Sequence, residues 1–473
     1  MSLKALGRQT FIYGFGHILT RLVTFLLLPF YTNILSQTEF GIISLIYTFL
    51  GFMTVILHYG LDASLLKHYV PAEREERTPI LSNAYLSFVL TSLLFSVGLI
   101  LLRYQVSSFL FGETLPKIVM MVAVIIFFDV LWSIHVLILR AEEKSVAFVS
   151  TSLLNVCLTL GLNIYFVVYL HEGVVGVVKS NLITSGILFI ATFPVIFSRI
   201  SFLTLSKDRW KKMMQFGMPF LPAGIFSMIL ELSDRYILKY LTDLETVGLY
   251  NAGYKLGMFM LLVAMGFNMG WQPYFLKKSK DETGYIAKIA TRLLFLMGFF
   301  WVLLVFWSGE LVQFKFGAYS FFGEEFWPAI KIVPFIAGAY VFHGLYLVQL
   351  PGVFIKEKTI YIAIVRGLGA VTNIILNFIL IPIYGIIGAA AATCISFFLM
   401  AFTLFFINKK IFPVVYEWKN ILVIFVSALG LYFLSINLDL SFMQKILMSL
   451  SFPIIALLLG VIRFQDVNIL IDK

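Results

Sequence analysis

The sequence predicts an all-α polytopic membrane protein with about 14 transmembrane helices. Three observations lead to this fold class. Of the 473 residues, 60% are hydrophobic and only 13% are charged, whereas a soluble chain carries about 25% charged residues. Apolar stretches long enough to cross a bilayer as helices recur from end to end. The intervening loops are too short to bury a core of their own, which argues against a separate catalytic domain.

The apolar stretches define the candidate spans in chain order. The first contains Arg21 and is too long for a cleavable signal, so we interpret it as an uncleaved span. The last two also fit helices that lie at the membrane interface. The fourteen stretches cover residues 10–35, 40–61, 79–102, 118–139, 146–170, 174–198, 213–240, 247–270, 285–308, 327–350, 359–381, 386–407, 415–436 and 443–462.

The loops on one side of the predicted membrane hold most of the 35 Lys and Arg residues. Positive loops favour the cytoplasmic side, and an even number of spans places both termini there. The net charge of +10 is therefore interpreted as a topology signal rather than as a sign of nucleic-acid binding. Cys157 and Cys394 both lie in apolar stretches, so no disulfide framework is expected.

An internal repeat divides the chain. Three landmarks of the first half recur in the same order and at nearly one offset in the second half. They pair Gly41 and Tyr47 with Gly248 and Tyr254, Glu143-Lys144 with Glu357-Lys358, and Gly173 with Gly385. The repeat predicts a six-helix bundle over residues 1–205, a second over 206–412, and two additional helices over 413–473. Halves with six spans each are related by an axis along the membrane normal, an arrangement typical of alternating access.

Cations and amides inside the spans are the candidate substrate-binding residues. A charge at the centre of a span costs about 2.5–3.5 kcal/mol on insertion scales, so each one needs a reason. A guanidinium can pair with two phosphate oxygens at once, which suits an anionic substrate. A structural ion pair or a side chain that reaches to the interface is the alternative for each. The candidates are His17, Arg21, Arg235, Lys255, Lys331, Arg366, Asn373 and Asn377.

Four acidic residues, Asp62, Asp129, Glu231 and Asp234, are the candidates for coupling to Na⁺ or H⁺. Asp129 could instead pair with Arg21, and Asp62 could serve only the end of a helix. Glu231 and Arg235 are one turn apart and could neutralise each other. They lie in the predicted outer third of their span, where long side chains reach water easily.

Several kinds of chemistry have no sequence support. The chain contains no G-x-x-x-x-G-K-[ST] phosphate-binding loop, no Cys/His cluster with metal-site spacing, and no nucleophile–His–acid set. We therefore expect neither an enzyme nor a resident cofactor or metal.

Four segments carry a resemblance to a known family. They are Leu28-Pro29-Phe30 to Gly41, Ser233-Asp234-Arg235, Gly248-Leu249-Tyr250-Asn251-Ala252-Gly253-Tyr254-Lys255, and Tyr384-Gly385-Ile386-Ile387-Gly388. The pattern resembles the polysaccharide-biosynthesis flippases. Their superfamily, the multidrug/oligosaccharidyl-lipid/polysaccharide exporters, also contains multidrug and toxin extruders and lipid II flippases.

The resemblance implies a monomeric flippase that moves an undecaprenyl-diphosphate-linked oligosaccharide from the cytoplasmic to the outer leaflet of the bacterial plasma (inner) membrane. The product would serve a surface polymer such as lipopolysaccharide O-antigen or capsule, with a polysaccharide polymerase and chain-length machinery as further partners. An ion-coupled multidrug or toxin exporter is the first alternative, although a cationic cleft suits cationic drugs poorly. A membrane enzyme of polysaccharide assembly is the second, and it would need an extramembrane catalytic loop.

Overall fold

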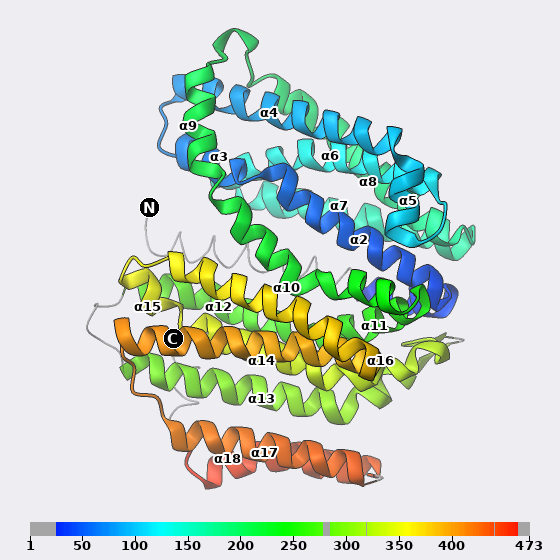
Figure 1. Cartoon of the computed structure of the whole chain (residues 1–473), viewed down its shortest axis with the longest axis vertical. Helices are drawn as coiled ribbons and strands as arrows, with labels where there is room; N and C mark the ends of the chain where they lie inside the picture. Colours follow the sequence, from blue (N-terminus) through cyan, green and yellow to red (C-terminus); the bar gives the residue numbers. More distant parts are fainter. Residues whose placement is uncertain (1–24, 278–283, 318, 439, 462–473) are drawn as a thin grey trace. The chain divides into compact units, whose positions relative to one another are not determined.

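The computed structural model describes residues 25–277, 284–317, 319–438 and 440–461. His17 and Arg21, two of the predicted substrate contacts, lie outside these ranges. Within them the chain is almost entirely helical, and the strand pairing is limited to a short hairpin of β1 (Lys315–Phe316) and β2 (Tyr319–Ser320). Figure 1 shows the helices in chain order.

The chain divides into two compact units, Met1–Gly248 and Leu249–Lys473. We describe each by itself. The helix α10 belongs to the first unit because it packs on α2, so the compact units do not divide at residue 205. The repeat-based boundaries after residues 205 and 412 follow from sequence similarity and stay a prediction.

The first unit is built around α6, which packs against α4, α8 and α2. Leu45, Ile125 and Val177 are among its buried apolar side chains. The short helix Phe25–Ile34 precedes α2. The further elements are α2 (Gln37–His58), α3 (Leu61–Tyr69), α4 (Arg74–Leu101), α5 (Arg103–Phe111), α6 (Pro116–Ala141), α7 (Ser145–Asn163), the π-helix Ile164–Tyr169, α8 (Gly173–Phe197), the 3₁₀ turn Phe202–Thr204, α9 (Lys207–Gly217) and α10 (Phe220–Leu241).

Helix α2 has well-defined ends. A capping box starts it: the Glu39 backbone N–H donates to Ser36 Oγ (3.2 Å), and the Ser36 backbone N–H donates to the Glu39 carboxylate (3.0 Å). Such reciprocal bonds satisfy donors that a helix start leaves unpaired. At the other end Tyr59 and Gly60 adopt positive φ values of 34° and 74°, which terminates the helix. The chain then starts again as α3.

The second unit is built around α14, which packs against α12, α13 and α16. Helix α11 (Leu244–Gly257) crosses the boundary between the units, and the rest of the second unit follows it. Its elements are α12 (Phe259–Lys277), α13 (Gly284–Gln313), the β hairpin, the 3₁₀ segment Glu324–Ile332, α14 (Val333–Val348), α15 (Leu350–Ile355), α16 (Ile360–Ile411), α17 (Trp418–Asn437) and α18 (Phe442–Leu458).

Helix α16 is two antiparallel arms rather than one rod. Gly385 has φ 57° and ψ −131°, outside helical geometry. Asn373 Nδ2 donates to Thr393 Oγ1 over 3.3 Å, although these residues would stand about 30 Å apart along a straight helix. The chain must therefore reverse at Gly385. This turn falls between the predicted spans 359–381 and 386–407.

The described residues contain nine helices long and apolar enough to cross a membrane, or up to eleven if two bent pairs each count as one span. One of the nine is the doubled helix α16, and α18 is a shorter apolar helix. The predicted all-helical, multi-pass membrane fold is confirmed.

Two of the predicted spans are each formed by two helices that meet at a bend. The region predicted as 213–240 is α9 and α10, which meet at 42°, and the region predicted as 247–270 is α11 and α12, which meet at 41°. Pro219 caps the start of α10, and a proline breaks a helix because it lacks an N–H and its ring clashes with the preceding turn. At the second bend, a side chain on Gly257 would overlap Ile336, so close packing of α14 marks this break.

Candidate functional site

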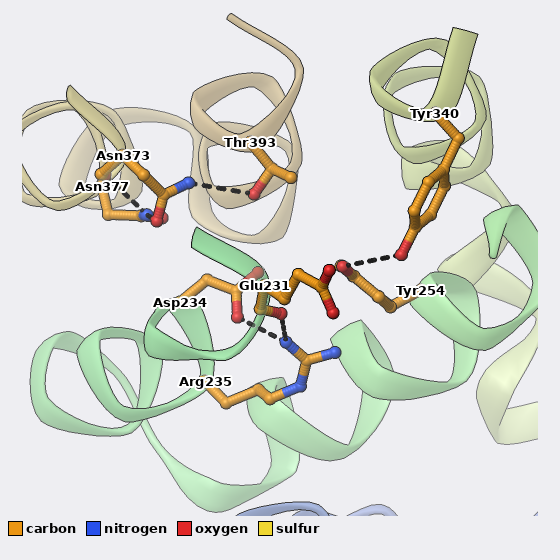
Figure 2. Close-up of polar contacts among 8 residues, drawn as sticks. All are labelled: Glu231, Asp234, Arg235, Tyr254, Tyr340, Asn373, Asn377 and Thr393. Atoms are coloured by element: carbon orange, nitrogen blue, oxygen red, sulfur yellow. Dashed lines mark hydrogen bonds and ion pairs between the residues drawn. The ribbon is translucent and has the colours of Figure 1, made fainter. Parts of the chain in front are cut away.

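The charged turn of α10 is buried. The side chains of Asp234 and Arg235 are 1% and 5% exposed. Arg235 Nη1 donates to Asp234 Oδ1 (2.7 Å) and to the backbone carbonyl of Glu231 (2.6 Å), as Figure 2 shows. The expectation that these side chains reach water from the outer third of the span is wrong for Asp234 and Arg235. Adjacent opposite charges neutralise each other, so neither has to reach the interface to be accommodated.

Asp129 lies midway along α6 beside polar groups from two other helices. Trp132 Nε1 donates to Asp129 Oδ1 over 2.9 Å, and Ser185 on α8 is a further hydrogen-bond partner. His58, at the end of α2, joins this cluster, because its Nε2 lies 3.1 Å from Oγ of Ser133 on the helix that carries Asp129. The cluster gives Asp129 neighbours within its own unit, as a proton or cation site requires.

Sequence reasoning missed His58. The signal was present, because a histidine inside an apolar stretch is unusual. The stretch 40–61 passed as a plain span because His58 falls at its edge. Asp62 lies four residues later in the first turn of α3, where a carboxylate stabilises the helix N-terminus. Its role in ion coupling stays a prediction.

Arg366 lies against buried rings of α14 in the second unit. Its charge acts on His343 and on Tyr346, whose rings stack with centroids 5.9 Å apart. Tyr340, one turn earlier, meets His343 edge-on, and its hydroxyl lies 3.2 Å from that of Tyr254 (Figure 2). Arg366 therefore belongs to a polar cluster inside the unit. Sequence reasoning named Arg366 but missed His343.

Asn373 and Asn377 are fully buried in α16. Asn377 Nδ2 donates to both oxygens of Asn373, the backbone carbonyl (2.8 Å) and Oδ1 (2.9 Å), and Asn373 in turn donates to Thr393 (Figure 2). These bonds join the two arms of α16. Asn377 Oδ1 has no hydrogen-bond donor in the described part of the chain. The predicted face Arg366–Asn373–Asn377 thus contains one partly exposed cation and two buried amides.

The two predicted lysine sites differ in exposure. Lys255 is half-buried in α11, next to Tyr254, while Lys331 is exposed in the 3₁₀ segment Glu324–Ile332. The position of Lys331 agrees with the alternative that it reaches the interface. A ladder of Arg21, Lys255 and Arg366 stays a prediction, because Arg21 lies outside the described residues.

Helix α2 makes a reciprocal glycine contact at each end. At its start, a Cβ on Gly41 would overlap the carbonyl oxygen of Leu244, and a Cβ on Gly248 would overlap that of Gln37. At its other end, a Cβ on Gly60 would overlap the carbonyl oxygen of Gly217. The sequence had matched Gly41 and Gly248 as equivalent landmarks of a repeat. The structure shows that these two glycines touch.

The contact between Gly60 and Gly217 is also reciprocal, because a Cβ on Gly217 would lie 2.7 Å from the Gly60 carbonyl oxygen. Only glycine allows backbones to approach this closely. Helix α10 packs along α2 between these two points. Helix α2 therefore has a contact between backbones, with no side chain in between, at each of its ends. All four glycines belong to the first unit.

The second unit has two apolar cavities of about 230 and 240 Å³ among α13, α14, α16 and α17. Phe342 and Phe425 line both, so the cavities adjoin. Their walls are almost wholly hydrocarbon and aromatic side chains, including Trp301, Phe402 and Tyr432. Such surfaces accept an alkyl or prenyl chain but not a sugar. Among the described residues, no group of three or more His, Cys, Asp or Glu could hold a metal ion.

Comparison with known proteins places these features in a family. An uncharacterised membrane protein of Methanocaldococcus jannaschii is 21% identical over 448 residues, covering 88% of this chain and 86% of that protein. The solved structure of the lipid II flippase MurJ in an inward closed conformation matches with a TM-score of 0.78 at 17% identity, covering 97% of this chain and all of that one.

An inward-facing multidrug resistance transporter of the MATE family matches with a TM-score of 0.60 at 14% identity, covering 83% of this chain and 97% of that one. The fold is therefore one used by flippases and exporters, in agreement with the prediction that the chain is no enzyme. The model of the family described as "polysaccharide biosynthesis protein" matches residues 6–279, more than half of the chain. The protein is thus a multi-pass membrane protein that belongs to the polysaccharide biosynthesis protein family.

Proposed function

We propose that this protein flips an undecaprenyl-diphosphate-linked oligosaccharide from the cytoplasmic to the outer leaflet of a bacterial plasma membrane, for surface polysaccharide assembly. The observation that carries the proposal is the family match over residues 6–279. The fold shared with a lipid II flippase supports it, since lipid II is likewise a lipid-linked saccharide. O-antigen and capsule precursors both fit this substrate class.

The diphosphate of such a substrate needs cations around it, whereas its lipid tail does not. Arg366 supplies a guanidinium beside Tyr346 and His343, and Lys255 supplies an ammonium in the same unit. A guanidinium matches diphosphate oxygens bidentately, while the tyrosine hydroxyls offer hydrogen bonds to sugars. Arg21 completes the proposed set of diphosphate contacts. His17, Arg235, Asn373, Asn377 and Lys331 remain secondary candidates.

The apolar cavities lined by Phe342 and Phe425 support the lipid part of the proposal. A long prenyl tail gains nothing by entering a polar passage, because it is already solvated by hydrocarbon. Apolar crevices among α13, α14, α16 and α17 let the tail stay against the protein within the lipid phase. The headgroup alone then has to be shielded.

The two glycine contacts of α2 support the proposal of alternating access. In the predicted topology, Gly41 and Gly248 lie at the outer side and Gly60 and Gly217 at the cytoplasmic side. Both contacts are closed in this structure. Backbone contacts without side chains separate and re-form with no rotamer to rearrange, which suits surfaces that open in turn. We propose that the outer contact opens for release and the cytoplasmic contact for loading.

Ion coupling is the least defined part of the proposal. Asp129 has a hydrogen-bonded environment with His58 nearby, which favours it as a proton or Na⁺ site over a plain structural acid. Asp234 is paired with Arg235 and would have to break that pair to take up an ion. Asn377 Oδ1, which has no hydrogen-bond donor in the described part of the chain, is also the kind of oxygen that binds hard cations. Glu231 and Asp62 stay further candidates.

Translocation of a defined substrate tests the function directly. Purified protein would be reconstituted into vesicles with an undecaprenyl-diphosphate trisaccharide, and arrival of the sugar at the opposite leaflet would be detected by its access to an added glycosidase. We expect Arg366→Ala and Arg21→Ala each to slow translocation at least tenfold, about 1.4 kcal/mol or more. Lys315→Ala, which removes an exposed cation of the β hairpin in the same unit, is the matched control and should retain at least half of the wild-type rate.

Three outcomes would contradict the proposal. Wild-type translocation by both arginine variants would remove the cationic diphosphate site. Failure of the wild-type vesicles to move the saccharide, together with uptake of a cationic dye such as ethidium down an imposed Na⁺ or H⁺ gradient, would assign the protein to drug export. Chemical modification of the saccharide without movement would instead indicate an enzyme of polysaccharide assembly.

A further inference from the structure

The segment from Phe202 to Gly217 has a surface that the transport proposal does not use. It consists of the 3₁₀ turn Phe202–Thr204 followed by α9. In Figure 1, α9 runs across the direction of α4 and α6 and lies against α3 and α4. Because α4 and α6 are membrane spans, a helix that crosses their direction at their cytoplasmic ends lies along the membrane surface.

Side chains of α4 fix the start of this segment in place. The backbone N–H of Ser206 donates to Asn83 Oδ1 (3.1 Å), and Trp210 Nε1 donates to Ser87 Oγ (3.1 Å). Near the end of α9, the Lys67 ammonium lies 3.6 Å above the ring of Phe216. These contacts fix the position of α9 against α3 and α4, so they also fix the direction in which its exposed side chains point.

The exposed side chains are of two kinds. Phe202, Leu203 and Trp210 are 61%, 98% and 40% exposed, although they are large and apolar. A fully exposed leucine next to a phenylalanine is costly in water and stable when it inserts into the boundary between headgroups and acyl chains. Tryptophan likewise prefers this boundary.

The second kind is cationic. Helix α9 carries four basic residues and one acid, Asp208. Glu76 on α4 forms an ion pair with Arg209 over 3.8 Å. Lys207, Lys211 and Lys212 are exposed and have no acidic partner within ion-pair distance in the described part of the chain. Uncompensated lysines beside inserted apolar groups match an anionic lipid surface, where each is attracted by the negative headgroups.

A crevice of about 390 Å³ lies between α4 and the start of α9. One end is polar and is formed by Ser206, Lys207 and Trp210. Leu86 and Leu90 of α4 line the other end together with Ser87 and Thr91, whose hydroxyls are hydrogen-bonded within the protein. From Asn83 to Leu90 the span advances about 10 Å, so the apolar end lies deeper along α4 than the polar end. A cavity with a cation at headgroup level and hydrocarbon walls below has the chemical profile of a phospholipid.

We propose that this crevice binds one anionic phospholipid of the cytoplasmic leaflet, with the phosphate at Lys207 and an acyl chain against Leu86 and Leu90. Lys211 and Lys212 add a general attraction to the surrounding anionic headgroups. The bound lipid fixes α9 to the membrane surface at the point where the chain enters α10. This site lies within the first unit and is independent of which saccharide the protein moves.

Retention of defined lipids tests the site. Full-length protein in detergent would be titrated with phosphatidylglycerol or phosphatidylcholine, and bound lipid would be counted by native mass spectrometry. We expect phosphatidylglycerol to bind more tightly than phosphatidylcholine and Lys207→Gln to weaken its binding about fivefold. Leu90→Trp, which fills the apolar end without changing charge, should weaken it by a similar factor. The double variant Lys409→Gln/Lys410→Gln removes two exposed cations at the end of α16 and should change binding less than twofold.

Three results would overturn the proposal. Wild-type binding of phosphatidylglycerol by Lys207→Gln would show that this lysine does not hold the phosphate. Equal losses in Lys207→Gln and in the α16 double variant, with no loss in Leu90→Trp, would indicate diffuse surface charge. Displacement of the lipid by millimolar inorganic phosphate would assign the site to a free anion. None of these readouts depends on flipping, so a failure here leaves the transport proposal untouched.

Discussion

The two ends of helix α2 use the same contact in different surroundings. At its start, Gly41 and Gly248 meet within two regular helices, and at its far end Gly60 meets Gly217 through a turn with φ +74°. The first contact depends only on space, whereas the second depends on space and on a backbone conformation that favours glycine. The difference teaches that the outer contact separates as two helices moving apart, whereas the cytoplasmic contact opens by moving Gly217 away from a turn whose own conformation requires glycine.

The surroundings reinforce this difference. Beyond Gly60, α3 ends at Tyr69, whose hydroxyl donates to Glu142 over 2.9 Å. Glu142 also accepts from Arg199 (2.7 Å) and pairs with Lys144 (2.7 Å). The carboxylate thereby links α3, the end of α6 and the end of α8. At the start of α2 the corresponding stabilisation is the local capping box of Ser36 and Glu39.

The largest effect is expected for Gly60→Ala. The added Cβ overlaps the Gly217 carbonyl and the residue must keep a positive φ, which together cost about 2–4 kcal/mol. We expect a lower melting temperature in fluorescence-detected size-exclusion chromatography and loss of most transport. Gly98→Ala is the matched control, because no atom of the described residues lies within 4 Å of the added Cβ and α4 should gain slightly. Equal melting temperatures for both variants would show that neither the close approach to Gly217 nor the positive φ restricts residue 60 to glycine.

An intermediate effect is expected for Gly248→Ala. Its Cβ overlaps the Gln37 carbonyl, but both helices can shift apart, so the cost is about 1–3 kcal/mol. We expect the protein to stay folded and to favour the state open at the outer contact. The measurement is thiol labelling of Ser44→Cys, one turn beyond Gly41, in a background with Cys157→Ser and Cys394→Ser. Labelling should rise in the Gly248→Ala protein, and an unchanged rate would refute the assignment of this contact as one that opens.

The smallest effect is expected for Glu142→Gln. Burial opposes ionisation of Glu142, but hydrogen bonds from Lys144 and Tyr69 and the nearby charge of Arg199 outweigh it, so the pKa of the carboxyl is lowered. A lowered pKa in the folded state adds stability above the ordinary value and loses it as the pH falls through the folded value. With partly exposed partners, the contribution is about 1–2 kcal/mol.

Thermal melts of this variant between pH 7 and pH 4 measure the effect. Wild type should be more stable than Glu142→Gln near neutral pH, and the difference should shrink once the pH falls below about 4.5, the ordinary carboxyl value. Glu113→Gln, which removes an exposed carboxylate after α5, should match wild type throughout. A difference between wild type and Glu142→Gln that stays constant with pH would mean that the carboxylate charge is not what holds α3 to α6 and α8.

The candidate site was predictable only in part. Arg366, Asp129 and Asp234 stand out because a charge in an apolar stretch is rare. Their neighbours His343 and His58 gave a weaker signal and Ser185 gave none, because only packing shows which carboxylate or guanidinium such a side chain meets. The burial of Arg235 depended on Asp234 being adjacent and on packing that no periodicity reports.

The sequence by itself determined the helical membrane class and the approximate spans, including the reversal near Gly385, because hydropathy and chain-breaking residues are local properties. It also predicted a repeat that pairs Gly41 with Gly248. The tertiary structure alone decided that these two glycines touch, that Gly60 meets Gly217, and that α10 packs on α2. A glycine contact is the absence of a side chain from two distant positions, and only the path of the folded backbone shows that such positions coincide.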